Sequence, residues 1–281
     1  MSAIPLLSKL RGRVDLTVRS DPSVDVRIVE RPGIHLDSRA CGALVADLRV
    51  VVARCLGGAS LDYGVFAGAK ERLDRSVVTV IYRKGTDEPI AFSALAILPV
   101  SLRGRSEDVL HLGLAMVDPG FRSHGLSWAL YGLTVMHMFV RRQLRPLWIS
   151  SVSQVPAVVG LVDTGFSRVF PSIAPDRRAT LEQLVVARQL MRHHRDAFGV
   201  GADAWFDEER FVIRNAYTGG SDHLKKSFDD AAKHRVDAYN DLCHRELDYE
   251  RGDDFLQVGQ YDLGVARRYL RRCVRRETAD V

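Results

Sequence analysis

The chain has little cysteine, and its cysteines are not arranged for cross-linking or metal binding. Among 281 residues there are four, at Cys41, Cys55, Cys243 and Cys273, and no two of them form a CxxC pair. Such scattered cysteines support neither a disulfide framework nor a zinc site. We therefore expect free thiols, no bound metal and a reducing, cytoplasmic environment.

Long apolar runs, low-complexity tracts and internal repeats are also absent. No stretch reaches the roughly 20 apolar residues that cross a bilayer, and the opening MSAIPLLSKLRGR lacks the apolar core of a signal peptide. An apolar fraction of 46% and a charged fraction of 27% are typical of a globular protein in water. The net charge of +5 suits anionic ligands but is too small to indicate nucleic acid. We expect neither a membrane nor a nucleic-acid partner.

The most informative stretch joins an apolar run of strand length, Val109–Val117, to a helically spaced apolar run, Leu126–Phe139. The residues DPGFRSHGLS connect them. A small-residue turn between a strand and a helix points several backbone N–H groups at one anion. Gly125 allows close approach to the backbone, and Arg122 adds a positive charge. This pattern predicts a pyrophosphate cradle, and its simpler alternative is an ordinary turn with a helix cap.

These residues resemble a motif of the GNAT acyltransferases, in which a strand ends in Val-x-Pro and Arg/Gln-x-x-Gly-x-Gly/Ala follows. The chain has Val117-Asp118-Pro119 and then RSHGLS, so that serine takes the last small position. In that family the turn binds the pyrophosphate of acyl-coenzyme A. The resemblance therefore implies acyl-CoA as a co-substrate, held by Met116, Val117, Arg122, Ser123, His124, Gly125, Leu126 and Ser127.

The order of the expected elements agrees with this resemblance. Strands are predicted at Asp25–Glu30, Val77–Tyr82, Ile90–Leu98, Val109–Val117 and Leu147–Val152, with helices from Asp37 or Ser38 to Leu56 and from Leu126 to Phe139. Antiparallel strands before a parallel pair are the order of a GNAT core. We therefore predict an α/β fold with a mixed sheet, of the GNAT acyl-CoA N-acyltransferase type.

A second family motif, Asn-x-x-Ala-x-x-Leu-Tyr-x-x-x-Gly-Phe, also has counterparts here. Gln154 stands at the asparagine, and Ala157 and Gly165-Phe166 are intact. Leu161 replaces the tyrosine that commonly protonates the departing thiolate, so the general acid is not assigned. A thiolate with a pKa of roughly 8.5 is nevertheless a tolerable leaving group without a proton donor.

We expect three segments: residues 1–24 as a loosely held N-terminal segment, 25–175 as the acyltransferase core, and 176–281 as a mostly helical extension. Within the extension, Thr180 can cap a helix, Phe211–Ile213 is predicted as a strand, and residues 223–248 are charged and helical. A last helix carries Arg267, Arg268, Arg271, Arg272, Arg275 and Arg276. Its arginine face is either solvated or a docking surface for an acidic partner.

Acyl transfer to an amine requires a base that takes the amine proton. His111 would share one strand face with Gly113, Ala115 and Val117. It also stands eleven residues before Arg122, where several GNAT enzymes have Glu or His. The resemblance thus implies His111 as the general base and Gln154 as a second catalytic position. A buried structural histidine that bonds across the sheet is an equally weighted alternative.

The function expected from these residues is N-acyl transfer from acyl-CoA, or from an acyl carrier protein, to an amine of a small molecule or a protein. The acceptor is not assigned. The alternative is a weakly active or inactive GNAT-fold module that binds or regulates through the basic terminal helix, and Leu161 favours this alternative slightly. The sequence leaves a homodimer open.

Overall fold

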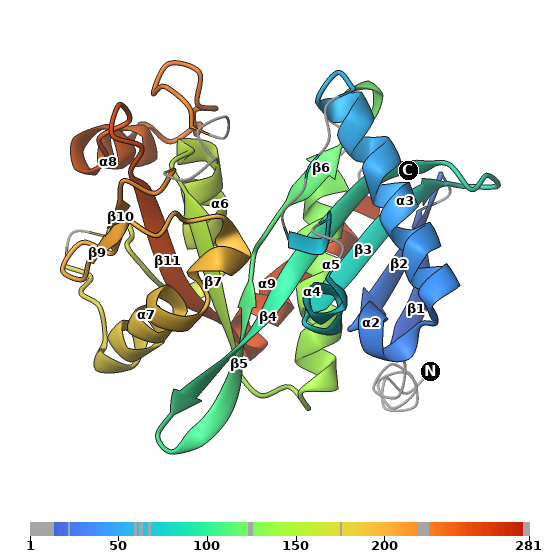
Figure 1. Ribbon diagram of the computed structural model, residues 1–281, viewed down its shortest axis with the longest axis horizontal. Helices are drawn as coiled ribbons and strands as arrows, with labels where there is room; N and C mark the ends of the chain where they lie inside the picture. Colours follow the sequence, from blue (N-terminus) through green and yellow to red (C-terminus); the bar gives the residue numbers. More distant parts are fainter. Residues whose placement is uncertain are drawn as a thin grey trace. The chain divides into compact units, whose positions relative to one another are not determined.

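The computed structural model describes residues 14–21, 23–58, 61, 64–66, 69–122, 126–174, 176–217 and 225–277, and only the backbone at 19–21, 127–128 and 272–277. The chain forms two compact units. Unit 1 comprises Met1–Ile97 and Leu112–Arg145, and unit 2 comprises Leu98–His111 and Pro146–Val281. Both units combine helices with strands (Figure 1), so the predicted mixed α/β class is confirmed.

Unit 1 is built on an antiparallel sheet. Its strands lie in the order β1 (Asp15–Asp21), β2 (Val24–Glu30), β3 (Ser76–Arg83) and β4 (Pro89–Leu102), and β6 (Ala115–Val117) pairs with the first residues of β4. The predicted strands before residue 100 are therefore confirmed. β1 corrects the expectation of a loosely held start, because Asp15 accepts hydrogen bonds of 3.0 and 2.7 Å from the Arg27 guanidinium on β2.

The two long helices of unit 1 are α3 (Ser38–Cys55) and α5 (Leu126–Arg141). Val78 and Val80 of β3 belong to the apolar cluster that α3 covers. Thr79, between them in sequence, lies 2.5 Å from the hydroxyl of Thr134 on α5. Since successive side chains of a strand point to opposite faces, the two helices cover opposite faces of the sheet (Figure 1).

Short helical segments complete the described part of unit 1: α2 (Pro32–His35), η1 (Gly64–Phe66), α4 (Lys70–Asp74) and η2 (Pro119–Phe121). The start of α3 agrees with the sequence prediction. The Asp37 carboxylate accepts a hydrogen bond of 2.7 Å from the backbone N–H of Ala40, which satisfies one of the unpaired donors at the helix start.

The strand predicted over Val109–Val117 is interrupted, and this corrects the sequence analysis. β5 (Arg105–His111) ends at His111, the next three residues belong to no strand, and β6 begins at Ala115. β5 pairs with a strand of unit 2, whereas β6 pairs with β4 in unit 1. A single strand face that carries His111 and Val117 together is therefore not formed.

Unit 2 contains a mixed sheet. The order is β5, β7 (Leu147–Ser153), β11 (Asp254–Tyr261), β10 (Val212–Arg214) and β9 (Trp205–Asp207), and β8 (Ser167–Phe170) also pairs with β11. β5 and β7 are parallel, and the other neighbours are antiparallel. The helices are α6 (Pro156–Gly165), α7 (Leu181–His193), η3 (Arg195–Phe198), α8 (Asp237–Glu246) and α9 (Leu263–Glu277).

The prediction of a mostly helical extension after residue 175 holds only in part, because strands are present beside α7, α8 and α9. The extension supplies β9, β10 and β11, and β11 pairs with β7 from Phe255 to Tyr261. The reason is burial: nearly every residue of β11 is buried, so the strand lacks the polar alternation by which a half-exposed strand is recognised. The charged helix predicted over 223–248 is limited, within the described residues, to Asp237–Glu246.

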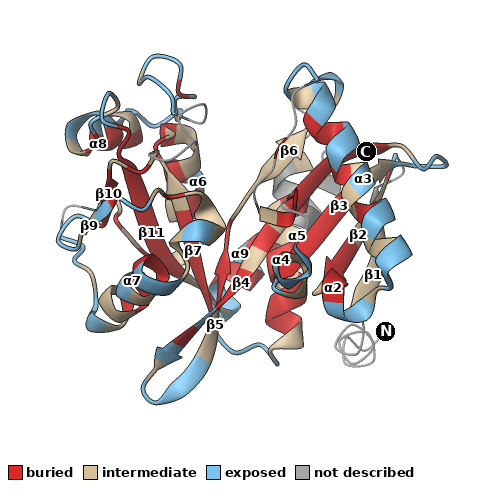
Figure 2. Cartoon of the chain, viewed as in Figure 1, coloured by how far each residue is buried: buried red, intermediate tan, exposed pale blue. Residues whose placement is uncertain are grey.

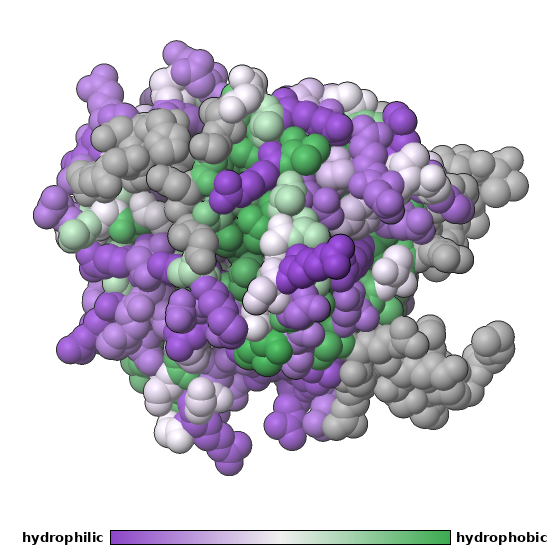
Figure 3. Space-filling model, turned by 45° about the vertical axis from the view of Figure 1, so that its right-hand side comes forward, coloured by the Kyte–Doolittle hydropathy of each residue, from purple (hydrophilic) through white to green (hydrophobic). Residues whose placement is uncertain are grey.

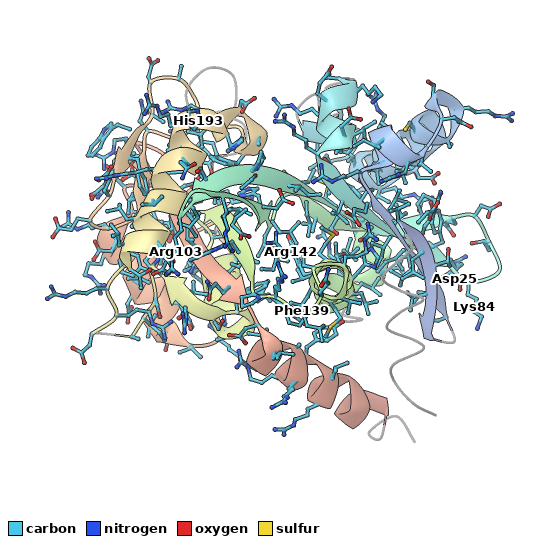
Figure 4. The ribbon with its side chains drawn as sticks, turned by 90° about the horizontal axis from the view of Figure 1, so that it is seen from below. Asp25, Lys84, Arg103, Phe139, Arg142 and His193 are labelled. Carbon is cyan, nitrogen blue, oxygen red and sulfur yellow. The ribbon has the colours of Figure 1, made fainter. Side chains whose placement is uncertain are left out.

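A tight turn joins β4 to β5 in unit 2. Arg103 and Gly104 have positive φ angles of 52° and 72°, the left-handed pair that suits a two-residue hairpin. Arg103 lies beside α7 (Figure 4), and its guanidinium pairs with Glu182 at 2.5 Å. The predicted cap of α7 is confirmed as a capping box, in which Thr180 and Gln183 each bond the other's backbone N–H.

The buried residues lie mainly in the strands of the two units. Figure 2 shows the central strands of each unit as buried, with the outer faces of α3 and α7 exposed. Hydrophilic side chains cover much of the face drawn in Figure 3, as a charged fraction of 27% requires. Cys41, Cys55 and Cys243 are free thiols, and the side chain of Cys273 lies outside the described residues.

The most deeply buried charge of unit 2 is the carboxylate of Asp253, which is fully inaccessible. Arg214 donates to it at 2.7 Å and Arg251 at 2.6 Å. The backbone N–H groups of Asp248 and Asn215 donate at 3.1 and 3.2 Å. Burial acts to raise the pKa of Asp253, but these hydrogen bonds prevail and hold the pKa below its ordinary value.

We predict that Asp253→Asn lowers the free energy of unfolding by roughly 3–5 kcal/mol, because it removes the buried partner of two arginines. A matched control is Glu208→Gln, which breaks the exposed pair with Arg188 and is expected to leave the free energy of unfolding nearly unchanged, because water screens such a pair. Urea unfolding at pH 7 measures both. The folded-state pKa of Asp253 is depressed, so its contribution to the free energy of unfolding is fully present above the unfolded-state pKa. That contribution is lost as the pH falls through the folded-state pKa. Equal costs for both variants would contradict the prediction.

Candidate functional site

The end of β6 in unit 1 is fixed by Asp118. One carboxylate oxygen accepts from the N–H of Gly120 at 2.9 Å, and the other lies 3.1 Å from Nη1 of Arg54 on α3. Arg54 also pairs with Glu88 at 3.1 Å. The N–H of Asp118 donates to Ile90 on β4 at 2.9 Å. The turn that leaves β6 is therefore tied to α3 and to β4.

Arg122 lies beside the thiol of Cys55, at the end of α3. Burial raises the pKa of that thiol, while the charge of Arg122 and its hydrogen bond to the sulfur act in the opposite direction. The thiol also donates to the carbonyl of Val117 at 3.3 Å. The predicted coenzyme residues Val117 and Arg122 thus meet at one place, the end of α3.

The remaining predicted coenzyme residues are only partly described. Met116 lies on β6 and packs partly buried against the α3 cluster. Leu126 is the first residue of α5. Ser123, His124 and Gly125 lie outside the described residues, as does the side chain of Ser127. The predicted order is therefore present, with the strand β6 before the turn and the helix α5 after it. The centre of the turn, residues 123–125, is not among the described residues.

His111 lies in the interior of unit 2, with 3% of its surface exposed. Nδ1 lies 3.0 Å from the hydroxyl of Ser150 on β7, and the ring centre lies 4.9 Å from that of Phe198. Burial lowers the pKa of His111 to about 4, so the ring is neutral at pH 7. This environment has the features of the structural alternative, a histidine bonded across the sheet. The general-base role stays a prediction.

Gln154 directly follows β7 and is 2% exposed. Its Nε2 donates to the hydroxyl of Tyr217 at 2.6 Å, and its Oε1 accepts from the N–H of Lys226 at 3.3 Å. Its backbone carbonyl accepts from the hydroxyl of Tyr249 at 2.7 Å. Tyr217 in turn donates to the buried carboxyl of Asp254 at 3.1 Å.

Sequence reasoning missed Tyr217 and Asp254. Asp254 is the first residue of β11 and 2% exposed, and burial raises its pKa to about 7. The sequence offered only a pair of adjacent acids, which is more often a solvated face. No local pattern could have found the contacts, because they join positions 37 and 63 residues apart.

Leu161, the residue at the position of the family's tyrosine, lies on α6 with 44% of its surface exposed. It has no proton to give. No group of three or more His, Cys, Asp or Glu side chains in the described part of the chain is arranged to hold a metal ion. Among the helices that the structure describes, none combines the length and the apolar character needed to span a membrane.

No protein-family model and no curated protein matches the chain in sequence. Solved structures do match part of it. A ribosomal-protein-S5-alanine acetyltransferase from Vibrio fischeri is 15% identical, with a TM-score of 0.37, over 54% of this chain and 83% of its own. Aminoglycoside N-acetyltransferase AAC(6')-Iy, solved in complex with CoA, is 19% identical, with a TM-score of 0.29, over 44% of this chain and 70% of its own.

A GNAT family acetyltransferase from Staphylococcus aureus is 14% identical, with a TM-score of 0.28, over 43% of this chain and 80% of its own. Each of these structures resembles only part of this chain, at low sequence identity.

The buried, neutral ring of His111 allows a test between its two possible roles, structural residue and general base. In the unfolded chain a histidine has a pKa of roughly 6.5, whereas the folded value is about 4. The unfolded state therefore binds more protons between these values, and wild-type stability falls as the pH drops from about 6.5 toward 4. His111→Gln removes this part of the pH dependence and can keep the bond to Ser150. Urea unfolding at pH 7 and pH 5 measures the difference.

Turnover completes this test. If His111 is structural, the Gln variant releases thiol from acyl-CoA at the wild-type rate, and His111→Ala mainly loses stability through lost packing on Phe198. A Gln variant that melts like the wild type but loses roughly a hundred-fold or more in rate would instead establish the general base.

Proposed function

We propose that the protein is an N-acyltransferase that uses acyl-CoA or an acyl carrier protein as donor and an amine as acceptor. The observation that carries the proposal is the connection from β6 to α5 in unit 1. There a strand end held by Asp118 and Arg54 leads, within a few residues, to the start of a long helix, with Arg122 beside the strand end.

The electrostatics of this connection suit an anionic donor. The N-terminus of a helix carries a partial positive charge and unpaired N–H groups. No acidic residue occupies the first turn of α5, so no side chain of the helix itself neutralises that charge. Arg122 is exposed and adds a full positive charge. Such a site favours a pyrophosphate over a neutral ligand.

The donor is either the free coenzyme or a carrier protein. Arg267, Arg268 and Arg271 are exposed on α9, while Val265 and Tyr269 on the same helix are buried. The side chains of Arg272, Arg275 and Arg276 lie outside the described residues. An exposed arginine face supports an acidic carrier, because surface charge of one sign speeds encounter with the opposite sign.

A second candidate function is a binding or regulatory module with little or no turnover. The observation that favours it concerns the two described positions at which the resemblance leads us to expect proton transfer, Leu161 and His111. Leu161 cannot donate a proton, and His111 is buried and neutral. A thiol-release assay with acetyl-CoA and longer acyl-CoAs over a panel of amines separates the two, since the module binds CoA without releasing thiol.

The donor site gives a direct test by calorimetry with CoA. Gly125→Glu introduces a side chain and a negative charge at the centre of the RSHGLS turn, so CoA affinity is expected to fall by at least about ten-fold, the loss of one charge-assisted contact. Gly42→Glu on α3 is the control, because it adds the same charge at an exposed position with open space around it. Equal CoA affinity in wild type and the Gly125 variant, or no binding to the wild type, would contradict the proposal.

A further inference from the structure

A pocket lined by arginines lies within unit 2 and is not used by the proposed function. It has a volume of about 520 Å³ and lies at the C-terminal end of α8, beside β10 (Figure 1). Sites for small molecules commonly have volumes of roughly 300–1,000 Å³. The charged residues that line the pocket are Arg210, Arg214, Arg245, Glu246, Asp248 and Arg251.

Arg214 is the buried arginine of the pocket, and its role is structural. Its guanidinium donates to Asp253 at 2.7 Å and to Asp207 at 2.9 Å. It also donates to the backbone carbonyl of Glu246 at 2.9 Å, which satisfies one of the unpaired carbonyls at the end of α8. A ligand in the pocket must therefore be held by the other arginines.

The other three arginines are exposed and have unused hydrogen-bond donors. Arg245 uses Nε, which donates to Glu246 at 2.9 Å. Nε of Arg210 lies 3.2 Å from the same carboxylate. Arg251 uses Nε and Nη2, both on Asp253. Within the described residues, no hydrogen bond is made by the Nη groups of Arg210 and Arg245 or by Nη1 of Arg251.

The two carboxylates that line the pocket are already engaged. Glu246 is shared between Arg210 and Arg245. Asp248 accepts a hydrogen bond of 2.9 Å from the backbone N–H of Arg251. The unused hydrogen-bonding capacity of the pocket thus consists mainly of guanidinium donors. A ligand that satisfies them must be rich in acceptor oxygens.

We propose that this pocket binds the phosphate group of a polar small molecule, such as a sugar phosphate. A phosphate has several oxygens that accept hydrogen bonds from different directions, so it can contact guanidinium groups on more than one side. A planar carboxylate is instead matched by a single guanidinium fork. Among the described residues that line the pocket, Leu247 alone is apolar, and it is buried. The pocket therefore suits a polar ligand better than an aromatic one.

The formal charges around the pocket are balanced before a ligand arrives. Asp207 and Asp253, together with the two carboxylates of the lining, offset the four arginines. A phosphate must therefore compete with Glu246 for Arg210 and Arg245. Removing the charge of Glu246 should accordingly strengthen phosphate binding, whereas removing either exposed arginine should weaken it.

Two substitutions with opposite expected effects test the pocket, by calorimetry of the full chain with glucose 6-phosphate. Arg245→Gln is expected to weaken binding by roughly ten-fold or more, the loss of a charge-assisted contact. Glu246→Gln is expected to strengthen binding by roughly two- to five-fold, the usual worth of a partly exposed ion pair. Inorganic phosphate should show the same pattern at lower affinity, and glucose without phosphate should not bind.

The matched control is Arg188→Gln, which removes an exposed arginine of unit 2 that pairs with Glu208 and does not line the pocket. It is expected to keep the wild-type affinity for glucose 6-phosphate. The proposal is overturned if the wild type binds neither phosphate probe, if Arg245→Gln and Glu246→Gln both keep the wild-type affinity, or if glucose binds as tightly as its phosphate.

The inference does not rest on the proposed function, because the pocket belongs to unit 2 and the RSHGLS turn to unit 1. Gly125→Glu is expected to keep glucose 6-phosphate binding, and Arg245→Gln to keep CoA affinity. Phosphate binding that is lost in Gly125→Glu and kept in Arg245→Gln would belong to the RSHGLS turn and would contradict the inference alone. A wild type that shows the expected phosphate pattern but does not bind CoA contradicts the proposed function and leaves the pocket established.

Discussion

The arrangement of unit 2 around the end of β7 depends on the buried carboxylate of Asp253. Two arginines and two backbone N–H groups converge on it, and these partners come from β10, from the residue after β10 and from the turn before β11. Asn215, held in this way, has a left-handed φ of 57°. Tyr217 follows two residues later. A buried ion pair of this kind costs desolvation, but it specifies one arrangement of the segments that it joins.

Asp253 and Asp254 are neighbours in sequence with opposite pKa shifts, and the difference lies in their partners. Asp253 accepts hydrogen bonds from two guanidinium groups, which stabilise its charged form although burial opposes it. Asp254 is also buried and accepts a hydrogen bond from the neutral phenol of Tyr217, so burial prevails and favours its neutral form. Asp253 is therefore a fixed charge that organises the loops, whereas Asp254 changes its charge near neutral pH.

Sequence patterns within a few residues of each other predict much of the fold but little of the candidate site. The cap of α3 at Asp37 and the capping box of α7 are contacts within a few residues, so the sequence predicts them directly. β11 was missed because it is buried along nearly its whole length and shows no alternation. The break after His111 was missed because it arises when successive segments take different strand partners. Tyr217 and Asp254 depend on contacts between segments distant in sequence, which no periodicity reports.

Burial moves the pKa values of His111 and Asp254 in opposite directions. A base of pKa about 4, such as His111 in its pocket, takes a given proton less readily than one of pKa about 7 by three pKa units, or about 4 kcal/mol. Efficient general bases have pKa values near the working pH. At pH 7 the ring of His111 therefore serves best as a neutral partner that holds β5 on β7 through Ser150. Burial of Asp254 instead leaves about half of this carboxyl protonated at the same pH.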